Sequence, residues 1–368
     1  MSGSGDSRTI LIAGGGTGGH LMPALAIAAA LRRDDPGRRI VLVGAVRGVE
    51  ATLLPQRDFP FDLLHAEPIY RRQWWRNIRW PFLAARLIRE VDALLDREKP
   101  AVVVGTGGYA SGPVVWRAAR RGIPTAIQEQ NAYPGLATRR LARMVREVWL
   151  GVPEARALLR GGPGTTFVDT GNPIVPPVPA LRAAASQRFG LDPARRVLLV
   201  TGGSQGALAI NEAVLAWLDR GGGAGLQVIW ITGRATYDRF RHRHDPPGVQ
   251  VLDFLDPMAE AYAVADLAIS RAGMMTVAEL SAWGIPSILI PLPTAAADHQ
   301  TPNARVMAEA GAAIHLPQSE LTGSRLGELV TGMLGSPAGL GAMATAARRR
   351  GRPDAAAQIS ARIGILSG

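Results

Sequence analysis

The sequence has 368 residues, of which 47% are hydrophobic and 19% charged, a length and composition that favour a soluble α/β protein of two domains. It contains no cysteine, which excludes a disulfide, a thiol nucleophile and a thiolate metal site. The net charge is +11, and most of the excess precedes residue 175, where 24 basic residues oppose 15 acidic ones. This asymmetry indicates an anionic partner such as a membrane surface, a nucleic acid or a phosphorylated substrate.

The first predicted element is a buried strand at 9–13, which enters the glycine loop Gly14–His20 and then a helix. Glycines let the backbone turn tightly and let a ligand approach the amides, so the loop indicates an anion site. A dinucleotide-binding turn is the alternative interpretation. Two features disfavour it, because the loop ends in His20 and no acidic residue closes the second predicted strand at 39–45.

Strand and helix patterns alternate up to residue 174, which predicts a parallel sheet covered on both faces. The remaining strands of this half are expected at 61–66, 101–106, 124–128, 147–151 and 165–169, with helices that include 78–97 and 137–145. Polar groups follow two of the strands, in the loop 106–113 and at Glu129-Gln130-Asn131. Together with His20 they would supply a general base and its orienting group, or two separate ligand contacts.

An aromatic and basic stretch at 69–82 contains three tryptophans and four arginines. Tryptophan prefers the membrane interface, and arginine is attracted to anionic lipid. The stretch therefore predicts membrane docking through Trp74, Trp75, Arg76, Arg79, Trp80 and Phe82. Stacking on a nucleic acid is the alternative. A buried loop is disfavoured, because removing its four arginines from water is energetically costly.

Four prolines within 171–179 predict a linker, and the strand–helix alternation restarts after it. Strands are expected at 196–200, 227–232, 249–254, 267–270 and 287–291, and the first of them enters a second glycine loop at 201–207. We therefore predict two doubly wound, Rossmann-like α/β domains, at 1–174 and 175–351, that face a cleft. A C-terminal helix at about 352–368 could pack back on the first domain.

Two segments of the second half carry candidate ligand groups. In 270–279 a strand ends and a helix begins at Gly273, so the first helical amides could hold a diphosphate. Glu279 could accept hydrogen bonds from ribose hydroxyls, and a solvated helix carboxylate fits the same spacing. In 298–304, Gln300 could recognise sugar hydroxyls, because an amide both donates and accepts. Helix capping by neighbouring polar residues is the alternative there.

Seven of these segments occur in the order found in glycosyltransferase family 28, and the chain resembles the peptidoglycan N-acetylglucosaminyltransferases of that family over nearly its whole length. The segments are 14–20, 107–113, 129–131, 171–173, 202–207, 273–279 and 298–304. The resemblance implies the glycosyltransferase B fold and inverting transfer of N-acetylglucosamine from its UDP donor to the C4 hydroxyl of lipid I, which is undecaprenyl-diphospho-N-acetylmuramoyl-pentapeptide. The product would be lipid II. A UDP-N-acetylglucosamine 2-epimerase, which shares the fold and the donor, is the alternative.

The resemblance also implies where the enzyme works and with what. It implies a peripheral protein on the cytoplasmic face of the cell membrane, with UDP-N-acetylglucosamine, lipid I, the anionic membrane surface and other cell-wall synthesis proteins as partners. It implies no cofactor, no catalytic metal and no nucleic acid. The absence of an Asp-x-Asp signature agrees with a metal-free mechanism. In such a mechanism the amides of the glycine loops would stabilise the developing charge.

Roles for individual residues follow from the same resemblance. His20 is the candidate base, with Glu129 as its competitor. Donor contacts are assigned to Thr17, Gly18, Gly19, Asn131, Ser204, Leu255, Gly273, Met274, Met275, Thr276, Glu279 and Gln300, of which the first four also line the acceptor side. Acceptor contacts are assigned to Gly16, Gly108, Tyr109 and Ser111, so that the first glycine loop would cradle the lipid diphosphate. The basic residue often found after the Gly-Asn-Pro motif is replaced by Ile174, and Arg271 is the candidate substitute.

Overall fold

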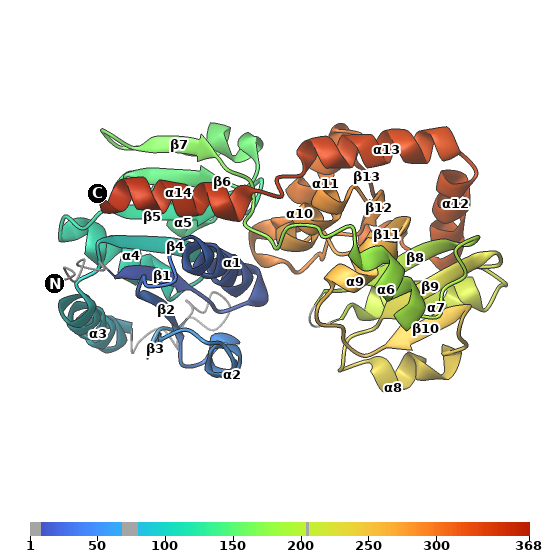
Figure 1. The fold of residues 1–368 in the computed structure, drawn as a ribbon, viewed down its shortest axis with the longest axis horizontal. Helices are drawn as coiled ribbons and strands as arrows, with labels where there is room; N and C mark the ends of the chain where they lie inside the picture. Colours follow the sequence, from blue (N-terminus) through green and yellow to red (C-terminus); the bar gives the residue numbers. More distant parts are fainter. Residues whose placement is uncertain (1–8, 68–79, 204–205) are drawn as a thin grey trace. The chain divides into compact units, whose positions relative to one another are not determined.

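The computed structural model describes residues 9–67, 80–203 and 206–368 (Figure 1). The chain forms two compact units. Unit 1 comprises Met1–Ile174 and Asp354–Gly368, and unit 2 comprises Val175–Pro353. Each unit is a parallel sheet with helices on both faces, so the predicted class of two doubly wound α/β domains is confirmed. No helix within the described ranges is long and apolar enough to cross a membrane.

Unit 1 is built on a seven-stranded sheet in the order β3-β2-β1-β4-β5-β6-β7. Side chains alternate between the two faces of its central strand, so Ile10 and Ile12 join one core cluster while Leu11 and Ala13 join the other. Because both faces are covered, this strand is apolar throughout. The strands are β1 (Ile10–Gly14), β2 (Ile40–Ala45), β3 (Phe61–Leu64), β4 (Val102–Gly107), β5 (Thr125–Glu129), β6 (Glu147–Leu150) and β7 (Thr166–Asp169).

The helices of unit 1 cover the sheet in two layers. The layer over Ile10 and Ile12 contains α1 (Gly18–Asp34) and α14 (Ala355–Ser367). The opposite layer contains α3 (Trp80–Glu98) and α4 (Ser111–Arg120). Two short helices, α2 (Glu50–Leu53) and α5 (Leu136–Leu141), lie in loops; α5 ends four residues before the predicted end at 145.

Unit 2 has a six-stranded parallel sheet in the order β10-β9-β8-β11-β12-β13. Its strands are β8 (Arg196–Thr201), β9 (Leu226–Ile231), β10 (Val249–Leu252), β11 (Leu267–Ser270), β12 (Ser287–Leu289) and β13 (Ala313–His315). Its helices are α6 (Leu181–Arg188), α7 (Leu208–Leu218), α8 (Tyr237–Phe240), α9 (Ala259–Val264), α10 (Met274–Trp283), α11 (Gln300–Glu309), α12 (Gly323–Leu334) and α13 (Pro337–Arg350). The edge strand β13 was not predicted, because three residues are too few for a periodic pattern.

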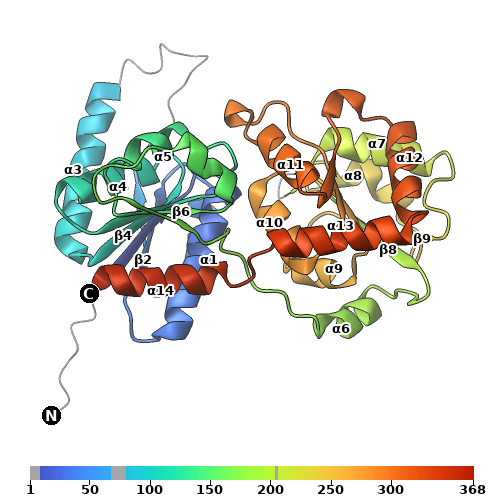
Figure 2. The same ribbon diagram turned by 90° about the horizontal axis from the view of Figure 1, so that it is seen from above.

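The C-terminal helix α14 returns to unit 1 and lies beside α1 (Figure 2). The hydroxyl of Ser360 donates to Asp34 Oδ2 at 2.6 Å. Arg362 donates from Nε to Glu147 Oε2 at 2.9 Å and from its Nη2 to the other oxygen of the same carboxylate. Glu147 is buried, with 4% of its surface exposed, and also accepts from the indole of Trp149. A buried carboxylate at the start of β6 therefore attaches the end of the chain to unit 1.

Replacing Arg362 by alanine is expected to destabilise unit 1. The substitution leaves the Glu147 carboxylate buried without its charged partner, and breaking such a pair costs about 3 kcal/mol or more. Thermal unfolding should show a clear loss of Tm. Arg349→Ala, at an exposed position on α13, is the control. Equal losses of Tm in the two variants would contradict the importance of this ion pair.

Candidate active site

Two glycine loops meet at the carboxyl end of the unit 1 sheet, because the strands before them, β1 and β4, are paired neighbours. The amide of Gly15 donates to the carbonyl of Gly107 at 3.4 Å. Gly108 has φ +84°, and a Cβ added there would overlap the carbonyl oxygen of Gly15. Glycine at this position therefore serves the close approach of the two loops.

His20 lies in the first turn of α1, at the junction of these loops. Its Nδ1 is 3.2 Å from Thr17 Oγ1, and its carbonyl accepts from Thr106 Oγ1 at 2.8 Å. A Cβ added to Gly107 would lie 2.5 Å from Cδ2 of the imidazole. The ring is partly exposed and bordered on both sides, which is a geometry suited to a general base.

The amides of Thr17, Gly18 and Gly19 stand at the start of α1 and donate to no residue in the described part of the chain. The positive end of the helix dipole favours an anion there. Tyr109 closes one side of the loop, since a Cβ on Gly16 would lie 2.6 Å from its ring. These three amides are therefore the donors of the first glycine loop that an anion could bind.

Gly16, a predicted acceptor contact, is already hydrogen-bonded within unit 1. Its amide donates to Glu50 Oε1 at 2.9 Å and to Oε2 at 2.8 Å, so it is not available to an acceptor phosphate. Glu50 is fully buried and also accepts from the amide of Ala45 at 2.8 Å. Sequence reasoning missed this residue. The available signal was an isolated acid shortly after β2, with Gly44 and Gly48 leaving space for its side chain.

Glu129 is buried, and its carboxylate accepts hydrogen bonds from the loop after β5. Oε1 accepts from the backbone amide of Asn131 at 3.0 Å and from its side chain at 3.2 Å, and Oε2 accepts from the amide of Gly135 at 3.1 Å. These bonds favour His20 over Glu129 as the base. They also hold Asn131, which is partly exposed, in a defined position.

Two further motif residues are buried. Ser111 is 3% exposed, and a Cβ on Gly105 would lie 2.6 Å from its hydroxyl, so it faces the sheet rather than a ligand. Asn172 of the Gly-Asn-Pro motif donates to the carbonyl of Gln130 at 3.1 Å and accepts from Gln128 at 2.8 Å. We therefore do not keep Ser111 among the proposed acceptor contacts, and Asn172 joins loops within unit 1.

In unit 2, Gly273 precedes α10 and leaves the amides of Met274, Met275 and Thr276 as the first three of the helix. None of the three donates to another described residue, so they can bind an anion at the end of β11. Leu255 is buried after β10. Ser204 lies outside the described residues.

Glu279 is partly buried and accepts a hydrogen bond from the hydroxyl of Tyr262 on α9, with 2.8 Å between Tyr262 Oη and Glu279 Oε2. Its other oxygen, Oε1, has no partner among the described residues. Burial raises the pKa of Glu279, and the bond from Tyr262 opposes this rise. Burial and the nearby carboxylate raise the pKa of Tyr262 well above its usual value. Glu279 is therefore paired with Tyr262 and is not the solvated helix carboxylate that its spacing along the helix also allowed.

Gln300 and Arg271 lie near the ends of the neighbouring strands. Gln300 Oε1 accepts from the amide of Leu292 at 3.0 Å, and the amide group of its side chain has no described partner to donate to. Arg271 Nη1 donates to the carbonyls of Ile290 and Pro291 at 3.3 and 3.1 Å. Burial lowers the pKa of Arg271. Both side chains retain donors that a ligand could use.

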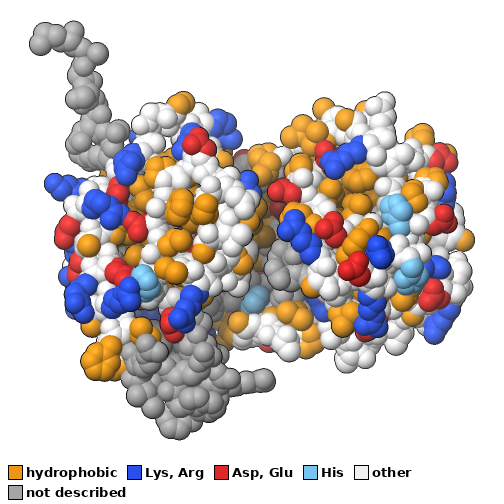
Figure 3. Space-filling model, turned by 90° about the horizontal axis from the view of Figure 1, so that it is seen from below, with side chains coloured by type: hydrophobic (Ala, Val, Ile, Leu, Met, Phe, Trp, Pro, Cys, Tyr) orange, Lys and Arg blue, Asp and Glu red, His pale blue; other side chains and the backbone are white. Residues whose placement is uncertain are grey.

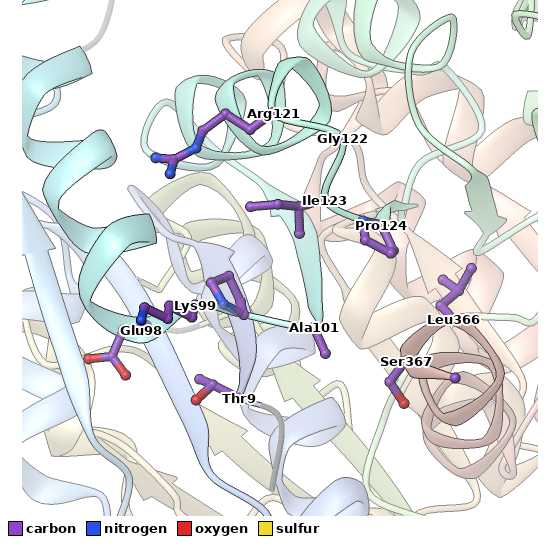
Figure 4. Close-up of a pocket in the computed structure, with 12 residues that line it drawn as sticks. Thr9, Glu98, Lys99, Ala101, Arg121, Gly122, Ile123, Pro124, Leu366 and Ser367 are labelled. Atoms are coloured by element: carbon purple, nitrogen blue, oxygen red, sulfur yellow. The ribbon is translucent and has the colours of Figure 1, made fainter. Parts of the chain in front are cut away.

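A cavity of about 650 Å³ lies at the opposite, amino end of the unit 1 sheet (Figure 4). Thr9, Ala101 and Pro124, which precede β1, β4 and β5, line it. None of the predicted site residues does. Across the described ranges, no group of three or more His, Asp or Glu side chains could hold a metal ion.

The predicted membrane stretch is described only from its end. Trp74, Trp75, Arg76 and Arg79 lie outside the described residues, and α3 begins at Trp80. Phe82 is 82% exposed on α3. Trp116 on the neighbouring helix α4 is 37% exposed, with the guanidinium of Arg120 6.0 Å from its ring. Figure 3 shows hydrophobic side chains gathered on one face of unit 1 with Lys and Arg at their edge.

Family models match both halves of the chain. The N-terminal domain model of glycosyltransferase family 28 matches residues 10–150, and the C-terminal domain model matches residues 197–359. Two curated relatives carry the name UDP-N-acetylglucosamine–N-acetylmuramyl-(pentapeptide) pyrophosphoryl-undecaprenol N-acetylglucosamine transferase. The one from Moorella thermoacetica is 40% identical over 94% of this chain and 95% of its own length. The one from Salinibacter ruber is 41% identical over 95% of each.

Solved structures with the same fold include transferases and epimerases. MurG of Acinetobacter baumannii matches with a TM-score of 0.75 and 29% identity, covering 97% of this chain and 99% of that one. A UDP-N-acetylglucosamine 2-epimerase from Neisseria meningitidis matches with a TM-score of 0.66 and 14% identity, covering 97% and 100%. The second likeness is one of fold alone.

Proposed function

Because the chain belongs to glycosyltransferase family 28, we propose that it transfers N-acetylglucosamine from UDP-N-acetylglucosamine to the C4 hydroxyl of lipid I, forming lipid II. The observation that carries this function is the identity of about 40% to transferases of that name over nearly the whole chain. The enzyme is then a hexosyltransferase with the B fold. The epimerase alternative has support from fold likeness only.

We propose that the two units contribute different parts of the chemistry. On unit 1, His20 would take the proton of the acceptor hydroxyl, while the amides of Thr17–Gly19 would face the acceptor diphosphate and donor sugar. Asn131, Gly108 and Tyr109 would complete that side. On unit 2, the amides of Met274–Thr276 would bind the UDP diphosphate. The positive end of the α10 helix dipole would stabilise the negative charge that develops as UDP leaves. Electrostatic stabilisation of this kind is usually the largest contribution to catalysis.

The nucleoside part of the donor would be held by side chains of unit 2. Glu279 would accept from the ribose hydroxyls with its unpaired Oε1, and Gln300 would donate to the sugar with its amide group. Leu255 and Ser204 remain predicted contacts to uracil and phosphate. Arg271 is the proposed substitute for the missing basic residue after the Gly-Asn-Pro motif.

A transfer assay tests this function directly. Purified protein would be incubated with labelled UDP-N-acetylglucosamine and a short-chain lipid I analogue, and both labelled disaccharide lipid and released UDP would be measured. Equal amounts of the two products are expected. Omitting the acceptor separates the alternatives, because an epimerase would still convert the donor to its manno isomer. Such conversion without transfer would contradict the proposal.

We further propose that unit 1 docks peripherally on the cytoplasmic face of an anionic membrane, where cell-wall synthesis proteins would be its neighbours. Exposed Phe82 and Trp116 on adjacent helices, with Arg86 and Arg89 exposed on α3, support this surface. Aromatic side chains enter the interface, and each nearby arginine adds about 1 kcal/mol on anionic lipid. The predicted residues Trp74, Trp75, Arg76, Arg79 and Trp80 would extend it.

Replacing Phe82 and Trp116 together by serine is expected to weaken binding to vesicles containing anionic lipid by ten- to a hundredfold. Burying one large apolar side chain contributes about 1.5–3 kcal/mol, and the interface buries each only in part. Flotation with vesicles measures the change, and transfer to a soluble short-chain acceptor should stay within twofold. Phe61→Ser, at a 40% exposed position on β3, is the control. Equal loss of binding and of soluble transfer would contradict a docking role.

A further inference from the structure

We propose that Glu50 is a positioning residue for the transfer reaction. It would fix the glycine loop that carries the free amides of Thr17–Gly19 and leads to His20. This inference rests on the proposed function. Glu50 matches no predicted site residue, and its carboxylate faces no ligand.

Glu50 links the loop after β1 to the end of β2, beyond the last residues at which these two neighbouring strands pair. Oε1 accepts from the amide of Ala45 at the end of β2 and from the amide of Gly16 in the loop after β1, at 2.8 and 2.9 Å. Oε2 accepts from Gly16 as well, at 2.8 Å. These are charge-assisted bonds in a fully buried place, where hydrogen bonds are strong and unpaired groups are costly.

Three glycines make room for this one side chain. A Cβ added to Gly15, Gly44 or Gly48 would overlap atoms of Glu50. Gly15 at φ +158° is extended backbone, so the missing side chain, rather than an unusual dihedral, is what the position requires. The loop, the end of β2 and the start of α2 therefore close around the carboxylate.

The position of the carboxylate decides which amides of the loop face a ligand. The carboxylate takes the place an anion would otherwise occupy on Gly16, so a ligand is left with the amides of Thr17, Gly18 and Gly19. Those amides belong to the same first turn as His20, whose ring adjoins Gly107. Displacing Gly16 would therefore move the amides and the base together. A misplacement of about 1 Å at such a site can cost roughly a hundredfold in rate.

Two substitutions at Glu50 would test the proposal. Glu50→Gln keeps one acceptor oxygen but turns an NH₂ group toward the amide of Gly16, whereas Glu50→Ala removes both acceptors. The expected order of kcat/KM for the acceptor is wild type, then Glu50→Gln at about one tenth, then Glu50→Ala at about one hundredth. The affinity for UDP itself, which lacks the donor sugar, should stay within twofold, because the proposed contacts to the nucleoside and its diphosphate belong to unit 2.

The matched control is Glu147→Gln, which alters another buried carboxylate of unit 1 at the start of β6. Thermal unfolding of all variants separates stability from positioning. If Glu50 and Glu147 variants with the same loss of Tm also lose the same fraction of kcat/KM, Glu50 acts only through stability and the proposal is overturned. Should Glu50→Ala fail to fold, Glu50→Gln carries the test alone.

Hydrogen exchange supplies a readout that does not need activity. Peptides covering residues 14–21 should exchange faster in Glu50→Gln than in wild type, with peptides of unit 2 unchanged. Unchanged exchange in the loop would overturn the proposal even if activity fell. If wild-type protein transfers no sugar, the proposed function fails and the positioning role fails with it. If wild type transfers and Glu50 variants match it, only this inference fails.

Discussion

His20→Ala is expected to lower kcat for transfer to lipid I by roughly a hundred- to ten-thousandfold, which is the range for losing a general base. The imidazole lies at the junction of the two glycine loops, is partly exposed and is of a type that can take a proton from a hydroxyl. The carboxylate of Glu129, the competing base, already accepts three hydrogen bonds. The loss should appear in kcat, with UDP affinity unchanged.

The controls for His20 separate chemistry from folding. His65→Ala changes another histidine of unit 1, which is exposed and paired with Glu90, and it should leave kcat within twofold. Tm should fall little in either variant, because neither ring is fully buried. Glu129→Gln retains an acceptor for the amides of the loop and should retain far more activity than His20→Ala. The reverse order of activities would assign the base to Glu129.

Glu279→Gln is expected to raise KM for UDP-N-acetylglucosamine by about ten- to a hundredfold with a smaller effect on kcat. A hydrogen bond to a charged acceptor contributes about 1.5–3 kcal/mol, and each 1.4 kcal/mol is tenfold in affinity. The glutamine still accepts from Tyr262, so the fold of α9 and α10 is retained. Calorimetric titration with UDP measures the same loss at equilibrium. Wild-type affinity in this variant would remove Glu279 from the donor site.

The pH dependence of UDP binding follows from the pKa of Glu279, which burial raises. The ionised carboxylate is the better acceptor, so affinity should fall as pH drops through that raised pKa. Tyr262→Phe removes the hydrogen bond that lowers the pKa, so the fall should move to higher pH. Titrations of UDP across the acidic range check the direction of the move. A shift to lower pH, or none, would contradict the role of the pair.

Sequence reasoning located the elements that carry the site because local patterns encode them. Alternating apolar strands and helices predicted two parallel sheets, and the glycine loops after β1, β4 and β8 marked strand ends. The order of seven motifs predicted the family, which the family models and relatives confirm. For residues such as His20 and Glu279 the pattern predicted a role that still awaits experiment.

The residues that sequence reasoning missed act through contacts between distant parts of the chain. Glu50 meets Gly16 from 34 positions away, and Tyr262 meets Glu279 from 17. Neither partner is marked by local spacing, since a lone acid after a strand or a tyrosine in an apolar helix is compatible with many environments. The return of α14 to unit 1 is likewise decided by Arg362 and Glu147, 215 positions apart.

By itself, the sequence therefore determined the two-domain α/β class, the positions of the glycine loops and the family. These features depend on periodicity, glycine and residue order, which are local properties of the chain. Only the tertiary structure decided which amides of the first loop remain free, which carboxylate is occupied and which is open to a ligand. Those outcomes depend on which buried donors and acceptors meet across the fold, where each must find a partner.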